Sequence, residues 1–190
     1  MNKGRLEAFS DGVLAIIITI MILEMKAPTG TTLSSLSKEW PLFIGYVLSY
    51  AFVGIYWINH HRILVKANCI NGRVLWANLF WMFCISFIPF TTAWAAETDF
   101  AKIPSVIYSF NVWMSTISYH LLAYSVLSSN HENCTFHGVM FMNRRNMFTF
   151  VLYTFAIVIA YITPLFAYAI HFINAIIWIL PNMQEVDAQE

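Results

Sequence analysis

Long stretches of this chain contain no acidic or basic residue, and they restrict its fold more than any other feature. The longest stretch runs for 39 residues from Asn146 to Gln184. As one continuous helix it would measure about 58 Å, nearly twice the roughly 30 Å of a bilayer core. Pro164 stands near its middle and cannot continue a helix without a break. We therefore expect two membrane-spanning helices joined by a tight turn at Pro164.

Four further apolar runs precede this stretch. They cover Gly12–Leu23, Pro41–Asn59, Val74–Ala96 and Ile103–Asn130. The whole chain is 59% hydrophobic and 11% charged, whereas a soluble domain carries about 25% charged residues. The runs predict an all-α integral membrane protein with six transmembrane helices, at residues 6–25, 41–65, 74–96, 104–128, 146–162 and 165–182. A single six-helix domain would fill residues 1–182, and a short acidic cytoplasmic tail would follow at residues 183–190.

The basic residues set the expected orientation of these six spans. On this topology seven Lys and Arg side chains fall on one side of the membrane: Lys3, Arg5, Arg62, Lys66, Arg73, Arg144 and Arg145. Three fall on the other: Lys26, Lys38 and Lys102. Membrane proteins keep the excess of basic residues in the cytoplasm. Both termini are therefore expected to be cytoplasmic.

Catalytic and metal-binding patterns are weak in this sequence. His131, Cys134 and His137 have a spacing that suits a metal, but a fourth ligand is missing locally and structural zinc sites are almost always four-coordinate. An ordinary polar loop is the preferred interpretation. No nucleophile, base and carboxylate set is evident, and only 7 Gly and a net charge of zero argue against phosphate cradles and nucleic-acid partners. We expect no enzyme activity, no cofactor and no metal site.

The first apolar run is unusual because it is too short. Its twelve residues rise only about 18 Å as a helix, so a span must carry Ser10, Asp11 and Glu24 into or near the membrane. Ionisable groups there are costly and usually face protein or a water-filled path. We therefore place this helix inside a bundle.

A helical wheel separates two faces of this first helix. At about 100° per residue, Ile20, Leu23, Phe9 and Gly12 fall within about 40° of Ile16, and Thr19 lies about 60° away. Asp11 lies about 140° away, nearly opposite. A plain lipid-facing or core stripe would give the same pattern, since almost every position is aliphatic. The carboxylate of Asp11 instead favours a helix that has polar partners on neighbouring helices.

Several motifs resemble those of the transmembrane protein 175 family, the endolysosomal potassium channels and their bacterial relatives. The resemblance begins with Arg5, Phe9, Ser10 and Asp11 ahead of an Ile-rich helix. It continues through Tyr56-Trp57-Ile58-Asn59-His60-His61-Arg62, Asn78-Leu79 and Pro89-Phe90-Thr91, and the six-span pattern covers essentially the whole chain. A single six-span unit resembles the bacterial form, which implies a bacterial plasma membrane.

The resemblance implies a homotetramer in the lipid bilayer, with the first helix of each subunit lining a central pore for monovalent cations. The permeant ion would be K⁺. The constriction would consist of Ile16, Ile20 and Leu23, with Gly12 and Thr19 beside it, in place of a carbonyl selectivity filter. Rings of such side chains can close a pore by dewetting.

The resemblance also implies an inter-helix polar network near the cytoplasmic end. Carried over by motif, its members are Arg5, Ser10 and Asp11, with His60 or His61 and Asn78 as partners. His60 could equally be a polar residue at a helix end, or make a buried hydrogen bond to another helix. Arg5 fits the network poorly, because its ideal phase lies near the pore face. The alternative function is a small proton- or cation-coupled secondary transporter with a His60, His61 and Asp11 relay.

Overall fold

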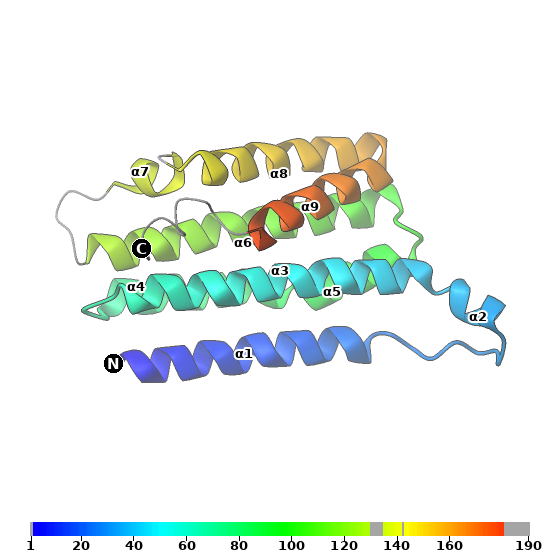
Figure 1. Cartoon of the computed structure of the whole chain (residues 1–190), viewed down its shortest axis with the longest axis horizontal. Helices are drawn as coiled ribbons and strands as arrows, with labels where there is room; N and C mark the ends of the chain where they lie inside the picture. Colours follow the sequence, from blue (N-terminus) through cyan, green and yellow to red (C-terminus); the bar gives the residue numbers. More distant parts are fainter. Residues whose placement is uncertain (1, 130–134, 142, 181–190) are drawn as a thin grey trace.

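The computed structural model describes residues 2–129, 135–141 and 143–180, and throughout these ranges every regular element is an α-helix. The elements are α1 (Lys3–Leu23), α2 (Leu33–Ser37), α3 (Trp40–Val65), α4 (Gly72–Ser86), α5 (Ile88–Glu97), α6 (Lys102–Ser128), α7 (Phe136–Phe141), α8 (Arg144–Ile162) and α9 (Pro164–Ile179). The long helices run side by side along the long axis of the molecule, with α1 at one edge and α8 at the other (Figure 1).

Helices occupy all six segments that the apolar runs predict. Four stretches are long and apolar enough to cross a membrane: Lys3–Leu23, Trp40–Val65, Gly72–Glu97 and Arg144–Ile162. Helix α9 is apolar but shorter, at 16 residues. Helix α6 has 27 residues, but its sequence is interrupted by serines, Asn111 and His120. Such polar positions suit a helix that lies between other helices, and α6 packs against α4, α5, α8 and α9.

Short polar side chains begin several of these helices. Asn71 Oδ1 accepts a hydrogen bond from the Val74 amide at 3.1 Å, and Asn143 Oδ1 accepts one from the Arg145 amide at 2.9 Å. These bonds satisfy amide groups that the first turn of a helix leaves unpaired. The predicted turn at Pro164 is confirmed, because α8 ends at Ile162 and α9 begins at Pro164, with a non-helical backbone at Thr163 (φ −138°, ψ 85°).

One predicted span is interrupted. The 74–96 segment forms two helices, α4 and α5, that meet at Phe87. Pro89 has no amide hydrogen to donate to the carbonyl of Ile85, and its ring crowds that turn. The hydrogen-bond ladder resumes with the Thr91 amide, which donates to the Phe87 carbonyl at 3.0 Å. Residues Gly72–Glu97 therefore form one candidate span that consists of two helices, with the break at Phe87.

Helix α1 is attached to the rest of the bundle on one side only. It packs against α3, α4 and α5, whereas α6, α8 and α9 pack beyond them. The buried core next to α1 includes Trp81, Leu64 and Val53, all with exposed fractions of 0%. Among the described residues, this arrangement leaves the other side of α1 uncovered.

Candidate functional site

The two faces of α1 differ sharply in burial. The buried face is regularly spaced along the helix: Leu6, Ser10, Leu14, Ile17 and Met21. The exposed face carries every residue that the sequence assigns to the pore: Gly12, Ile16, Thr19, Ile20 and Leu23. The side chains of Ile16, Ile20 and Leu23 are 58%, 40% and 78% exposed. Large apolar side chains with this exposure require a covering partner or lipid.

The exposed part of α1 carries small residues, which are scarce on the outer faces of α3 and α4. Ala8, Gly12 and Ala15 are all exposed on α1, and a Cβ atom added at Gly12 would meet nothing within 4 Å. The outer faces of α3 and α4 instead carry bulky side chains such as Phe43 and Phe83, each 60% exposed. Small residues allow the backbones of membrane helices to approach closely. The α1 face is therefore suited to contact with other helices or to lining a space.

Thr19 is the polar side chain in the middle of this face. Its hydroxyl donates a hydrogen bond to the carbonyl of Ile16 at 2.8 Å, within the same helix. This bond satisfies the hydroxyl hydrogen without a partner from another element. The oxygen of Thr19 remains on the exposed face, between Ile16 and Ile20.

A buried chain of hydrogen bonds ties α1 to α4 and α3. Asn78 Nδ2 on α4 donates to Ser10 Oγ on α1 at 3.0 Å. Asn78 Oδ1 accepts from His60 Nε2 on α3 at 2.9 Å. The exposed fractions of Ser10, Asn78 and His60 are 0%, 0% and 1%, and the His60 ring stacks on Trp81 with centroids 4.9 Å apart. The structure thus brings together three of the six residues predicted for the network.

Asp11 has a different partner from the one expected. Trp57 Nε1 on α3 donates a hydrogen bond to Asp11 Oδ1 at 2.9 Å, and both side chains are exposed in the single chain. Asp11 therefore connects α1 to α3 beside the Ser10, Asn78 and His60 chain. Sequence reasoning missed Trp57, because no spacing rule joins positions 46 residues apart.

Arg5 and His61 lie outside this chain of bonds. Both are exposed, and within the described residues neither makes a side-chain hydrogen bond to Ser10, Asn78 or His60. His60 is bonded to Asn78 and Asp11 to Trp57, so hydrogen bonds do not join His60, His61 and Asp11 into a relay. The phase of Arg5 places it on the same side of α1 as Ile16.

Several other buried polar groups join helices to one another. Ser49 on α3 lies 2.7 Å from the Thr92 hydroxyl on α5 and 3.1 Å from the Tyr108 hydroxyl on α6. His171 on α9 is fully buried, and its Nε2 lies 2.9 Å from Ser109 Oγ on α6. Interhelical bonds of this kind hold membrane bundles together.

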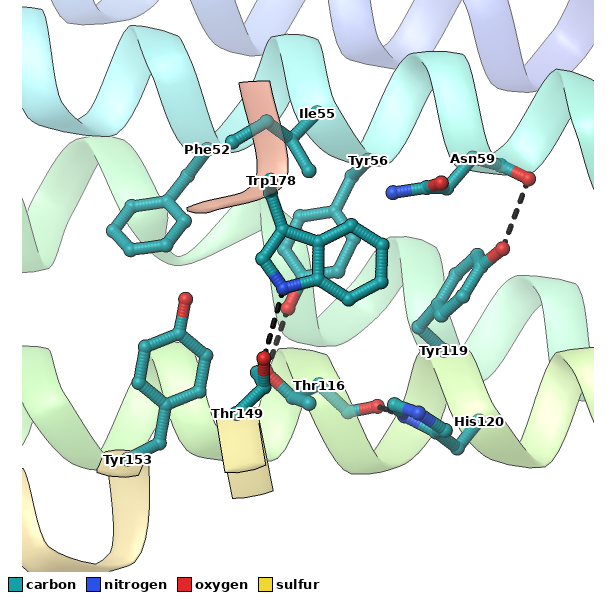
Figure 2. Close-up of a pocket in the computed structure, with 10 residues that line it drawn as sticks. All are labelled: Phe52, Ile55, Tyr56, Asn59, Thr116, Tyr119, His120, Thr149, Tyr153 and Trp178. Atoms are coloured by element: carbon teal, nitrogen blue, oxygen red, sulfur yellow. Dashed lines mark hydrogen bonds between the residues drawn. The ribbon is translucent and has the colours of Figure 1, made fainter. Parts of the chain in front are cut away.

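A small internal cavity lies between α3, α6, α8 and α9 (Figure 2). Its volume is about 30 Å³, and its walls include Tyr56, Thr116, Thr149 and Tyr153. The Tyr56 hydroxyl lies 2.8 Å from Thr116 Oγ1, and Trp178 Nε1 donates to Thr149 Oγ1 at 2.8 Å. A space of this size has room for one or two water molecules. It is too small for an organic substrate.

The sequence motif that suggested a metal falls mostly outside the structure. His131 and Cys134 lie outside the described residues, and only His137 is within them. Among the residues that the structure does describe, no group of three His, Cys, Asp or Glu side chains is placed to hold a metal ion.

Comparison with known proteins points to one family. Residues 5–89 match the family described as the endosomal/lysosomal potassium channel TMEM175. A potassium channel from a Chryseobacterium strain is 38% identical over 182 residues, which are 96% of this chain and 95% of that protein. The human endosomal/lysosomal proton channel TMEM175 is 36% identical over 80 residues, or 36% of this chain and 16% of the human protein.

A solved structure shares the fold. The crystal structure of a lysosomal potassium-selective channel TMEM175 homolog from Chamaesiphon minutus superimposes with a TM-score of 0.81 at 29% sequence identity. The match covers 93% of this chain and 95% of that one. The similarity therefore extends over nearly all the helices described above.

Proposed function

The chain belongs to the TMEM175 family of potassium channels and is a multi-pass membrane protein; we propose that it conducts K⁺ through a pore lined by α1. The pore would form on the axis of a homotetramer, where the exposed faces of four α1 helices meet. All six predicted segments would cross the membrane, with both termini in the cytoplasm. The permeant species would be K⁺ and other monovalent cations.

The observation that carries this proposal is the uncovered face of α1. Ile16 and Leu23 are 58% and 78% exposed among the described residues. Ile20 is 40% exposed and stands at the edge of this face, where it lines a groove together with residues of α4 and α5. In a fourfold assembly each of these residues would form a ring of four aliphatic side chains. A narrow apolar neck does not hold a continuous column of water, so such rings can close a pore by dewetting.

The hydrogen bonds on the opposite side of α1 support the same assignment. Ser10 and Asp11 bind α4 and α3 near the cytoplasmic end, whereas the predicted constriction extends from Ile16 to Leu23. Polar contacts thus fix the first half of α1, and apolar packing joins its second half to the neighbouring helices. A small rotation or splay of the apolar part would widen the rings and leave the polar contacts intact.

Ion flux from liposomes tests the proposal. Ile16→Asn and Leu23→Asn each place an amide in a ring, so we expect a higher basal K⁺ flux than in the wild type. Ile173→Asn on α9 is the matched control, because its side chain is 55% exposed but lies far from α1 in the chain and does not belong to the rings. Equal flux from the α1 variants and the wild type, in tetramers of normal size, would refute the assignment of the constriction.

The transporter alternative is not favoured. The relatives that cover most of this chain are potassium channels, and the relay residues His60 and Asp11 are each bonded to a different partner, Asn78 and Trp57. Single-channel steps in planar bilayers under K⁺/Na⁺ bi-ionic conditions would distinguish a channel from a carrier. The same recordings at different proton gradients would measure any proton current beside the K⁺ current.

A further inference from the structure

A second cavity, separate from α1, opens where α9 ends. Helix α9 stops nearer the middle of the bundle than the adjoining ends of α3 and α6 do (Figure 1). The cavity there has a volume of about 320 Å³ and is bounded by residues of α3, α6, α7, α8 and α9. Ligand sites in proteins commonly begin at about 300 Å³. This space is therefore large enough for a polar headgroup.

Basic and amide side chains line one wall of this cavity. Asn59, Arg62, Ile63 and Lys66 follow one another at helical spacing along α3, so that they share one face. Arg145 contributes a third cation from the opposite wall, on α8. Asn143 and Asn146 add neutral hydrogen-bonding groups. Among the described residues that line the cavity, none is acidic.

Contacts with α9 hold the Arg145 guanidinium in place. It lies over the Trp178 ring, 4.5 Å from the ring centroid, and Nη2 donates to the Leu180 carbonyl at 3.2 Å. Nη2 also donates to the carbonyl of Ile177. A cation near the carbonyl end of a helix is favourably placed. The positive charge is consequently fixed in the wall before any ligand arrives.

The other lining is apolar. Ile63, Ala123, Leu127 and Val139 come from α3, α6 and α7 and form the hydrocarbon part of the wall. Asn146 Nδ2 donates to the Val139 carbonyl at 3.1 Å and so joins α7 to α8 at this point. The cavity thus offers cations and amides beside an aliphatic surface. Its position at helix ends, with Trp178 in the wall, fits the level of the membrane interface.

We propose that this cavity binds the headgroup of an anionic phospholipid. The phosphate would lie between Arg62 and Lys66 on one side and Arg145 on the other, and the acyl chains would follow the aliphatic wall. Basic pockets between membrane helices on the cytoplasmic side bind acidic headgroups in this way. A zwitterionic lipid carries a cation of its own, which the three basic residues would repel. The proposal is independent of ion conduction, because the cavity does not include the exposed face of α1.

Native mass spectrometry of the purified full-length protein with added lipid tests this site. We expect phosphatidylglycerol to bind and phosphatidylcholine to bind far more weakly. A double variant, Arg62→Gln with Lys66→Gln, removes two surface cations and is expected to bind phosphatidylglycerol about 30-fold more weakly, at about 1 kcal/mol for each basic residue. Arg145 is left unchanged in this test because it also contacts α9.

Two matched variants complete the design. Lys38→Gln with Lys102→Gln removes the same charge outside the cavity and should leave phosphatidylglycerol binding unchanged. Arg62→Lys with Lys66→Arg keeps both charges and should retain most of the binding. Equal binding of phosphatidylcholine and phosphatidylglycerol, or equal loss in the control and the cavity variants, would overturn the proposal. Displacement of the lipid by inorganic phosphate at the same concentration would assign the cavity to free phosphate instead.

Discussion

The bonds of Asn78 allow one quantitative test of how α1 is held. Replacing Asn78 by Ala deletes the amide that bridges α1 and α3, and it leaves Ser10 Oγ and His60 Nε2 without their partner. Both groups are at most 1% exposed, so water cannot replace the lost bonds. Interhelical hydrogen bonds in membrane proteins contribute about 0.6 kcal/mol on average and at most about 1.7. Two such bonds predict a loss of about 1.2–3.4 kcal/mol in the free energy of unfolding.

A double-mutant cycle separates the hydrogen bond from other effects of the substitution. Ser10→Ala, Asn78→Ala and their combination are unfolded by SDS in mixed micelles, with tryptophan fluorescence as the measurement. Trp81 is buried against His60 and lies within the region that changes. We expect a coupling energy of about 0.6–1.7 kcal/mol between positions 10 and 78, because the single variants share one bond.

A second pair supplies the control for this cycle. Thr154 on α8 accepts a hydrogen bond from Trp113 Nε1 and has no partner in common with Ser10. The effects of Ser10→Ala and Thr154→Ala on the free energy of unfolding are therefore expected to add within about 0.3–0.5 kcal/mol. A coupling between positions 10 and 78 no larger than in this pair would mean that the bond between α1 and α4 contributes nothing measurable.

Two further predictions concern the attachments of α1 and α3. Asp11→Ala removes the hydrogen bond from Trp57, so we expect a smaller tetrameric fraction in size-exclusion chromatography with light scattering. Asp11→Asn should preserve that fraction. A tetrameric Asp11→Ala variant with altered K⁺/Na⁺ selectivity would contradict this role. Gly45→Val should lower the free energy of unfolding by about 1–3 kcal/mol through overpacking, because a Cβ added at Gly45 would lie 3.3 Å from Thr92 Cγ2. Gly54→Val on the same helix meets nothing within 4 Å of its Cβ and should melt within a few degrees of wild type.

The helices were largely predictable because hydrophobic runs and prolines act locally. The turn at Pro164 was confirmed, and the six apolar segments coincide with helices. The break at Phe87 was missed although Pro89 was visible, since a proline inside an apolar run can bend a span or divide it. The short helices α2 and α7 were also missed, because they lie between the apolar runs.

The polar contacts were only partly predictable because they join distant parts of the chain. The sequence left two interpretations of His60 open, and the structure supports the buried hydrogen bond to another helix. Trp57 was noted as part of a family motif, without a partner, yet it donates to Asp11 from a position 46 residues away. Pairings of this kind depend on how helices are rotated against one another, and hydrophobic periodicity constrains that rotation weakly when nearly every position is apolar.

The one-sided attachment of α1 has a consequence for biosynthesis. Helix α1 leaves the ribosome before any of the helices that hold it, and Ser10 receives its hydrogen bond from a residue made 68 positions later. Asp11 gains its partner only when Trp57 on α3 has been made, and Ser10 gains its partner only when Asn78 on α4 has been made. A chain that terminates before Asn78 would therefore contain α1 without its hydrogen bond to α4. We expect membrane quality-control proteases to degrade such a chain.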